Sequence, residues 1–125
     1  METRFYEFSQ NNSGGTFVVD DKLCHRLYIE AETKNQAIRI AEDLGCYWDG
    51  CESGEDCTCC GDRWYRDPDI IDIKRLSKVY GEKFDSIEDY AQYLANTYGW
   101  TTPDARIFYL NKDVVDIKIQ KKNDK

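Results

Sequence analysis

The chain has 125 residues and a formal net charge of −7 at pH 7, and 41% of its residues are hydrophobic. This length and composition indicate one globular domain with a single core and argue against a second domain. The acidic balance argues against a protein that holds nucleic acid through its phosphates, and no apolar run approaches the length that crosses a membrane.

The N-terminal part predicts two strands that pair as a hairpin. Residues 3–9 are rich in aromatic side chains and suit one strand, and residues 10–16 have turn chemistry throughout. The return strand is expected to begin at residues 17–19 and to continue through residues 23–30. Four side chains of this segment share one face, namely Leu23, His25, Leu27 and Ile29.

Two helices are predicted from capping signals and apolar spacing. Thr33 and Gln36 match a capping box, and the apolar residues that follow recur at helical spacing as far as the stop signal Gly45. Asp85 and Glu88 form a second start signal, before another apolar stripe. Both helices are expected to pack on a sheet. Between them the pattern indicates only short extended pieces, near residues 64–65 and 78–80, with the isoleucines at 70, 71 and 73 ambiguous.

A closing hairpin and a polar tail complete the chain. Period-two alternation returns in residues 106–110 and 114–119, on either side of a polar turn. Strands that gather at both ends around two helices predict an α+β domain over residues 1–120. The expected architecture is an antiparallel sheet with two helices on one face and the cysteine-rich segment 46–62 inserted as a loop. Residues 121–125 form a polar C-terminal tail.

Five of the six cysteines lie within one short segment, and two of them form a C-x-x-C-G sequence. They are Cys46, Cys51, Cys57, Cys59 and Cys60. No signal-peptide pattern opens the chain, so a reducing compartment with free thiols is expected. Structural zinc would take Cys57 and Cys60 from one turn and Cys46 and Cys51 from another, leaving Cys59 spare. The alternative is a set of thiols that merely pack as small apolar side chains.

The cysteine-rich segment is also acidic. Residues 42–62 contain seven carboxylates and no basic residue. They are Glu42, Asp43, Asp49, Glu52, Glu55, Asp56 and Asp62. Such a run attracts cations and repels phosphate. It is either a solvated loop that keeps the protein soluble or an acidic interaction surface.

A ligand site is a further hypothesis. Residues 11–15 offer backbone N–H groups that could cradle a phosphate, while an arginine and a tryptophan pair a guanidinium with a stacking ring. The candidate ligand residues are Asn11, Asn12, Ser13, Gly14, Gly15, Arg63, Trp64 and Arg66. The structural alternative is a glycine-containing hairpin loop, a tryptophan that anchors the cysteine-rich segment, and an arginine that answers nearby carboxylates.

No catalytic constellation is predicted. The single histidine, His25, is in strand phase with Leu23 and Leu27, which indicates a half-buried sheet residue rather than the base of a cysteine nucleophile. The C-x-x-C sequence lacks the strand-to-helix context of a redox motif. A catalytic zinc needs an open coordination position and usually histidine ligands. The sequence therefore indicates a protein that is not an enzyme.

Four blocks of the chain carry a family resemblance. They are residues 5–15, the helix that ends at Gly45, residues 59–64 and the helical residues 88–90. Together they resemble small, mostly uncharacterised proteins encoded by tailed bacteriophages. The resemblance spans most of the chain and brings no catalytic motif. It implies a short acidic accessory protein that acts in the cytoplasm of the infected bacterium, where it binds and disables a host component.

Two functional hypotheses follow. The first is a non-enzymatic phage accessory protein with a role in counter-defence, which either sequesters a nucleotide-like immune signal with the candidate ligand residues or blocks a basic host protein with the acidic segment. The second is a zinc-stabilised nucleic-acid-binding or transcription-machinery adaptor. Carboxylates interleaved with the basic residues of 63–83 argue against the second. The oligomeric state is left open.

Overall fold

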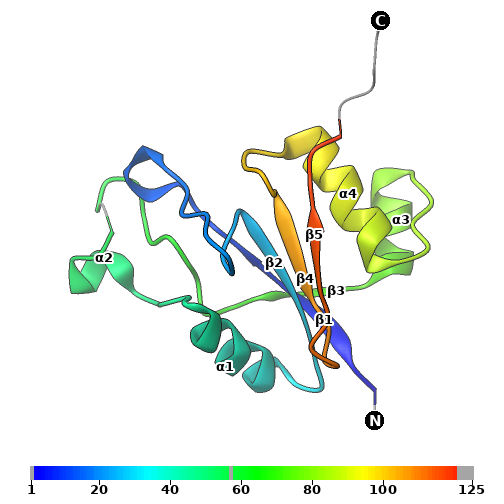
Figure 1. Cartoon of the computed structure of the whole chain (residues 1–125), viewed down its shortest axis with the longest axis horizontal. Coiled ribbons are helices and arrows are strands. Elements are labelled where there is room, and N and C mark those ends of the chain that lie inside the picture. The colour runs from blue at the N-terminus through cyan, green and yellow to red at the C-terminus, as the bar shows by residue number, and fades with distance from the viewer. Residues whose placement is uncertain (1, 57, 121–125) are drawn as a thin grey trace, which may run out of the picture.

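The computed structural model describes residues 2–56 and 58–120 (Figure 1). Its strands are β1 (Arg4–Ser9), β2 (Arg26–Ala31), β3 (Asp69–Ile71), β4 (Ala105–Phe108) and β5 (Val114–Ile117). Its helices are α1 (Lys34–Leu44), α2 (Gly50–Ser53), α3 (Ile73–Tyr80) and α4 (Ile87–Tyr98), and a 3-10 turn covers Ser13–Gly15. Among these described helices, none is both long and apolar enough to cross a bilayer.

The strands form one mixed sheet in the order β3-β1-β2-β4-β5. Every neighbouring pair is antiparallel except β2 and β4, which run parallel. The α+β class is confirmed, as are the pairing of the first two strands and the closing hairpin. The return strand begins later than expected, because the Gln10 side chain bonds both backbone groups of Val18 and holds that segment outside the sheet.

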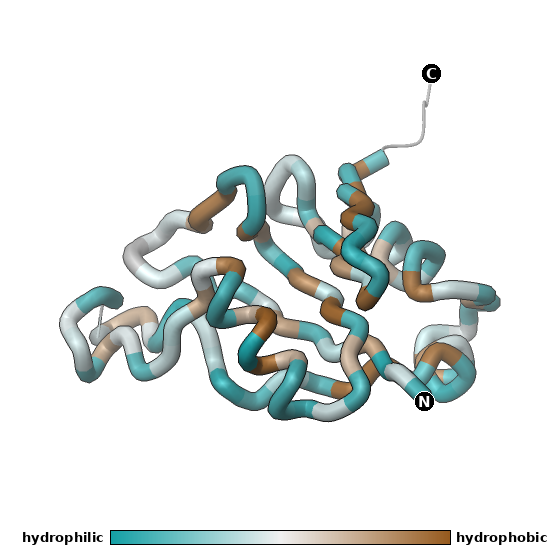
Figure 2. Tube along the Cα trace, turned by 60° about the horizontal axis from the view of Figure 1, so that its bottom comes forward, coloured by the Kyte–Doolittle hydropathy of each residue, from teal (hydrophilic) through white to brown (hydrophobic). Residues whose placement is uncertain are grey.

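The two long helices cover opposite faces of the sheet, so the expectation of two helices on one face is wrong. Leu27 and Ile29 pack in the cluster that contains α1, whereas Tyr28 packs in the cluster that contains α4. All three are fully buried. Three consecutive buried residues in one strand require cover on both faces. Figure 1 shows the sheet between α1 and the α3–α4 pair, and Figure 2 shows hydrophobic residues running through the central strands.

Side-chain caps set the helix starts. The predicted Thr33 cap is confirmed, since its Oγ1 accepts a hydrogen bond from the Gln36 N–H at 3.1 Å. Helix α4 begins one residue later than predicted, because Ser86 is the cap and accepts from the Asp89 N–H at 3.2 Å. Capping residues decide these boundaries because the first N–H groups of a helix lack partners within the helix.

The extended piece predicted at residues 78–80 is wrong, because these residues end α3. Asp72 caps this helix by accepting a hydrogen bond from the Arg75 N–H at 3.2 Å, and Gly81 ends it in the left-handed conformation. The helix also sets Ile73, Leu76 and Tyr80 against the core cluster of α4. Tertiary packing on this face therefore overrides the strand propensity of a valine followed by a tyrosine.

Candidate functional site

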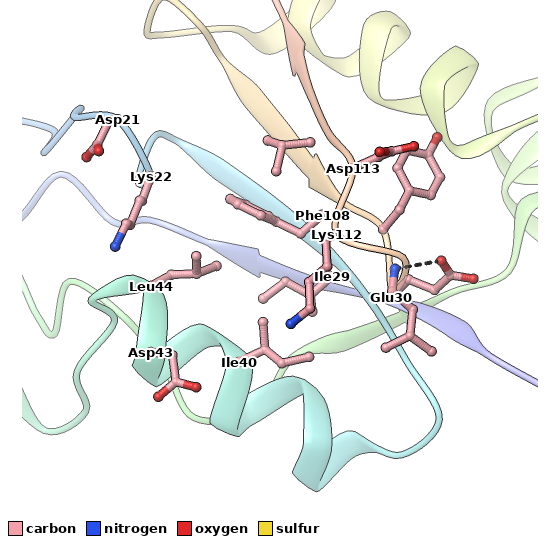
Figure 3. A pocket seen from close by; sticks show the side chains of 13 residues that line it. Asp21, Lys22, Ile29, Glu30, Ile40, Asp43, Leu44, Phe108, Lys112 and Asp113 are labelled. Carbon is pink, nitrogen blue, oxygen red and sulfur yellow. Dashed lines mark hydrogen bonds between the residues drawn. The ribbon is translucent and has the colours of Figure 1, made fainter.

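A groove of about 480 Å³ opens between α1 and the β4–β5 hairpin (Figure 3). It lies on the α1 face of the sheet, at the edge of the area that α1 covers. Strand phase places Ile29 of β2 on this face, and Phe108 of β4 is its parallel register partner. The part of the groove between α1 and the sheet is therefore built by regular elements, which hold its shape better than loops do, whereas part of its lining comes from loops.

The floor of the groove is apolar. Figure 3 shows Ile40 and Leu44 pointing from α1 toward Ile29 and Phe108 of the sheet. Val114 extends this surface, since it is the antiparallel register partner of Phe108 and is 53% exposed. An exposed apolar surface bounded by charged residues is typical of a binding site.

The rim of the groove carries charge of both signs and is net acidic. Its four carboxylates outnumber its two lysines: Asp21, Glu30, Asp43 and Asp113 against Lys22 and Lys112. Glu30 also fixes the hairpin, because it accepts hydrogen bonds from the Leu110 N–H at 3.0 Å and from Thr3 Oγ1. Asp43, near the end of α1, belongs both to the rim of the groove and to the acidic segment.

The acidic segment is mostly open to solvent. Five of its seven carboxylates are exposed, namely Glu42, Asp43, Asp49, Glu52 and Glu55. Asp56 is buried, and Asp62 is half-buried and accepts a hydrogen bond from the Cys51 N–H at 2.9 Å. A negative surface of this kind attracts a basic partner over a distance of about a Debye length, ~8–10 Å at physiological salt.

The predicted ligand residues are brought together, but they bond to one another. The Arg63 guanidinium donates to Gln10 Oε1 at 3.0 Å and to the carbonyl oxygens of Thr16 and Ser13, each at 2.8 Å. Its Nε lies 3.7 Å from Asp56 Oδ1. Trp64 is 1% exposed. The geometry supports the structural alternative for this arginine and tryptophan.

Except for Arg66, the remaining predicted ligand residues lie beside the same contact. Asn11 Nδ2 donates to the carbonyl oxygen of Cys60 at 2.7 Å and to that of Asp62 at 3.2 Å. Asn12 and Gly15 close the 3-10 turn through a backbone bond of 2.8 Å, with Gly14 between Ser13 and Gly15 in that turn. Arg66 is exposed. The sequence predicts that Arg63 answers a nearby carboxylate, and Asp56 is the one that it approaches. It does not reveal Gln10 as a partner of Arg63, because Gln10 lies 53 positions away and resembles an ordinary turn residue.

The proposed zinc ligands are spread over different environments. Cys46 is buried, Cys51 is half-buried and Cys60 is exposed, while Cys57 lies outside the described residues. Within the described ranges, no group of three or more metal-binding side chains is close enough to hold an ion. Burial raises the pKa of the Cys46 thiol to about 12. The zinc site stays a prediction.

His25 is part of a buried polar cluster. Its Nδ1 lies 2.9 Å from Asp104 Oδ1, and Arg26 donates to Asp104 Oδ2 at 3.0 Å. Asp104 is fully buried and also accepts from the Trp100 N–H at 2.7 Å. Burial alone would raise the pKa of Asp104, but the hydrogen bonds from His25 and the Trp100 amide lower it overall. The cluster joins the start of β2 to the loop before β4.

One family model matches almost the whole chain. It is described as a domain of unknown function, DUF7296, and it covers residues 3–122. No curated protein and no solved structure matches the chain.

Proposed function

The chain belongs to the DUF7296 family, and we propose that it is a non-enzymatic binding protein that holds a basic, partly apolar segment of a partner protein in the groove between α1 and the β4–β5 hairpin. Following the resemblance to phage proteins, the partner is a host protein in the bacterial cytoplasm. Binding disables that protein, and counter-defence is the purpose.

The observation that carries this proposal is the combination of an apolar floor with a net-acidic rim. Ile40, Leu44 and Phe108 offer apolar contact, and the carboxylates at the rim and along the acidic segment match a basic segment in charge. The alternative of a sequestered nucleotide-like signal has less support, because Arg63 and Trp64 are buried and engaged with protein groups.

Fluorescence anisotropy with three labelled peptides tests the proposal. One peptide is an amphipathic helix of leucine and lysine, the second replaces lysine with glutamate, and the third replaces leucine with serine. We expect the leucine–lysine peptide to bind best, since it alone offers both an apolar face and positive charge. Val114→Lys should weaken its binding by about tenfold, the loss typical of a contact residue near the centre of an interface.

Tyr98→Lys is the control. Tyr98 is 50% exposed at the end of α4, on the opposite side of the sheet, so adding the same charge there should leave peptide binding unchanged. Thermal melts should show both variants folded. Equal binding of the serine–lysine peptide, or an equal loss in both variants, would mean that general charge attraction explains the binding and that the groove does not.

A further inference from the structure

A second pocket lies on the opposite face of the sheet, between the β1–β3 pair and the helices α3 and α4. Its volume is about 610 Å³, within the range of roughly 300–1,000 Å³ that is usual for small-ligand sites. Glu7 of β1 and Asp69 of β3 line it from the sheet, and Tyr80 and Tyr90 line it from the helices. It shares no lining residue with the groove.

The sheet side of this pocket carries two opposed carboxylates. Glu7 and Asp69 are direct register partners on antiparallel strands, and like charges in that position repel. Glu7 Oε2 accepts a hydrogen bond from the Tyr28 hydroxyl at 2.7 Å, and in the described part of the chain no donor to Oε1 is recorded. Arg75 also lines the pocket and Arg26 acts on Glu7 electrostatically, but no described lysine or arginine forms an ion pair with either carboxylate. A bound cation would therefore give the carboxylates the direct partner that these arginines do not provide.

Aromatic rings form the helix side. The ring centroids of Tyr80 and Tyr90 are 6.0 Å apart and the rings are tilted by 56°. Tyr90 stands edge-on to Tyr28, with centroids 6.2 Å apart. Tyrosine faces attract ammonium and guanidinium groups, most strongly where water is excluded. Burial and the nearby Glu7 carboxylate also raise the pKa of Tyr90, so this ring stays neutral.

The mouth of the pocket carries aliphatic side chains of α3 beside the exposed Arg75. Val79 is 65% exposed, and it lines the opening together with the half-buried Leu76. An inorganic ion would leave these side chains in water, whereas a hydrocarbon stem behind a cationic head would cover them. The site thus presents a carboxylate pair on its sheet side, rings on its helix side and aliphatic groups at its entrance.

We propose that this pocket binds an alkylammonium or alkylguanidinium group, with the cation between the Glu7 carboxylate and the tyrosine rings and the alkyl stem against Leu76 and Val79. The same chemistry is available from a free aliphatic amine and from a lysine or arginine side chain of a partner. The site is independent of the groove, so it stands even if the groove binds nothing.

NMR titration of the ¹⁵N-labelled protein tests the proposal with n-butylguanidinium and n-butylammonium chloride as probes, beside n-butanol and butyrate. We expect saturable shifts of amides in β1, β3 and α3 with the two cations and none with the alcohol or the acid. Equal shifts with n-butanol would overturn the proposal. So would a failure of the two cations to saturate the protein by about 10 mM, because a dissociation constant above that concentration means weaker binding than most specific ligands show. Acetyl-Val-Arg-Val-amide distinguishes the sources, since tighter binding than n-butylguanidinium indicates a partner side chain and weaker binding a free amine.

Glu7→Gln is the decisive variant and Glu82→Gln its control. Glu82 is exposed at the end of α3, outside the pocket. Glu7→Gln should weaken cation binding by about tenfold or more, because it removes a hydrogen bond between charged groups, whereas Glu82→Gln should change nothing. An equal affinity in both variants would overturn the proposal. The glutamine oxygen can still accept from Tyr28, so the variant is expected to fold.

The pH dependence gives an independent measurement. Burial is the main cause that raises the pKa of Glu7, against the lowering effect of the Tyr28 hydrogen bond. The groups that face it are His25, Arg26, Tyr28, Asp69, Arg75, Tyr80 and Tyr90. Cation affinity should fall as pH drops through the Glu7 pKa, because protonation neutralises the carboxylate that pairs with the ligand cation. Glu7→Gln should remove this dependence, and a wild-type affinity that does not change with pH would contradict the assignment.

The stability of the ligand-free protein should fall as pH rises through the Glu7 pKa, whereas cation affinity should rise. Because the Glu7 pKa is raised by folding, ionisation costs folding free energy as pH rises through that pKa. Glu7→Gln should therefore match or exceed the wild-type melting temperature at neutral pH and lose that advantage in acid. A large loss of stability at neutral pH would assign Glu7 a structural role instead of a ligand-binding one.

Discussion

Arg63→Ala is expected to lower the free energy of unfolding by about 3–5 kcal/mol, the range measured when one partner of a buried ion pair is removed. Alanine would leave the fully buried Asp56 side chain without its cation and would remove the donors from the carbonyl oxygens of Ser13 and Thr16. Because a whole domain is stable by only about 5–15 kcal/mol, urea unfolding should show the loss clearly.

Arg66→Ala is the control for this prediction. Arg66 is exposed three positions along the chain, so its removal should change stability by no more than about 0.5 kcal/mol. Arg63→Lys should recover part of the loss, because one ammonium cannot reach all the acceptors that a planar guanidinium reaches. If Arg63→Ala were as stable as Arg66→Ala, the guanidinium would not tie the two loops together, and a ligand-binding role would regain support.

Asp104→Asn is expected to cost about 3 kcal/mol or more at neutral pH, again as the loss of a buried, paired charge. Asparagine keeps the size of the side chain, but it removes the negative charge that faces His25 and Arg26. Its NH₂ group must also face one of the groups that donate to Asp104 in the wild type, such as Arg26 or the Trp100 N–H, and two donors cannot form a hydrogen bond. Thermal unfolding against Asp21→Asn, an exposed loop residue, measures the difference.

The Asp104 effect should fade in acid. The pKa of this carboxyl is lowered by folding, so its contribution is present at neutral pH and is lost as pH falls below the ordinary carboxyl range. The gap between the wild type and Asp104→Asn should narrow over that interval, while the gap for Asp21→Asn should stay small throughout. A gap that does not change with pH would show that shape, and not charge, explains the cost.

Local signals predict the two longest helices, α1 and α4, and the two hairpins of this fold. Thr33 marks its helix start because a cap needs one residue type at one position, and alternation marks β4 and β5 because they are short and regular. The placement of the helices on two faces is harder to predict from the sequence. Leu23, Leu27 and Ile29 share one face of the strand, which is the pattern expected when only that face is buried. The burial of Tyr28 between them is the sign of the second layer.

The sites are harder to predict than the fold. Arg63 and Trp64 belong to residue types that bind nucleotides. The sequence offers several nearby carboxylates as partners for the guanidinium without singling out Asp56, and it carries no sign that Gln10 will reach it. The groove depends on the parallel register of Phe108 beside Ile29, which joins distant parts of the chain. Glu7 and Asp69 likewise face each other only because β1 pairs with β3, and local sequence patterns do not encode that pairing.

The parallel pairing of β2 and β4 has a consequence for how the protein is made. The contact between Arg26 and Asp104 spans 78 positions of the chain. At about 5–20 residues per second, a ribosome needs several seconds to reach the second strand after completing the first. During that interval β1 and β2 can already pair, but β2 has one edge with no neighbour. The nascent chain thus carries an open strand edge, of the kind that recruits other chains, until its C-terminal hairpin emerges to close it.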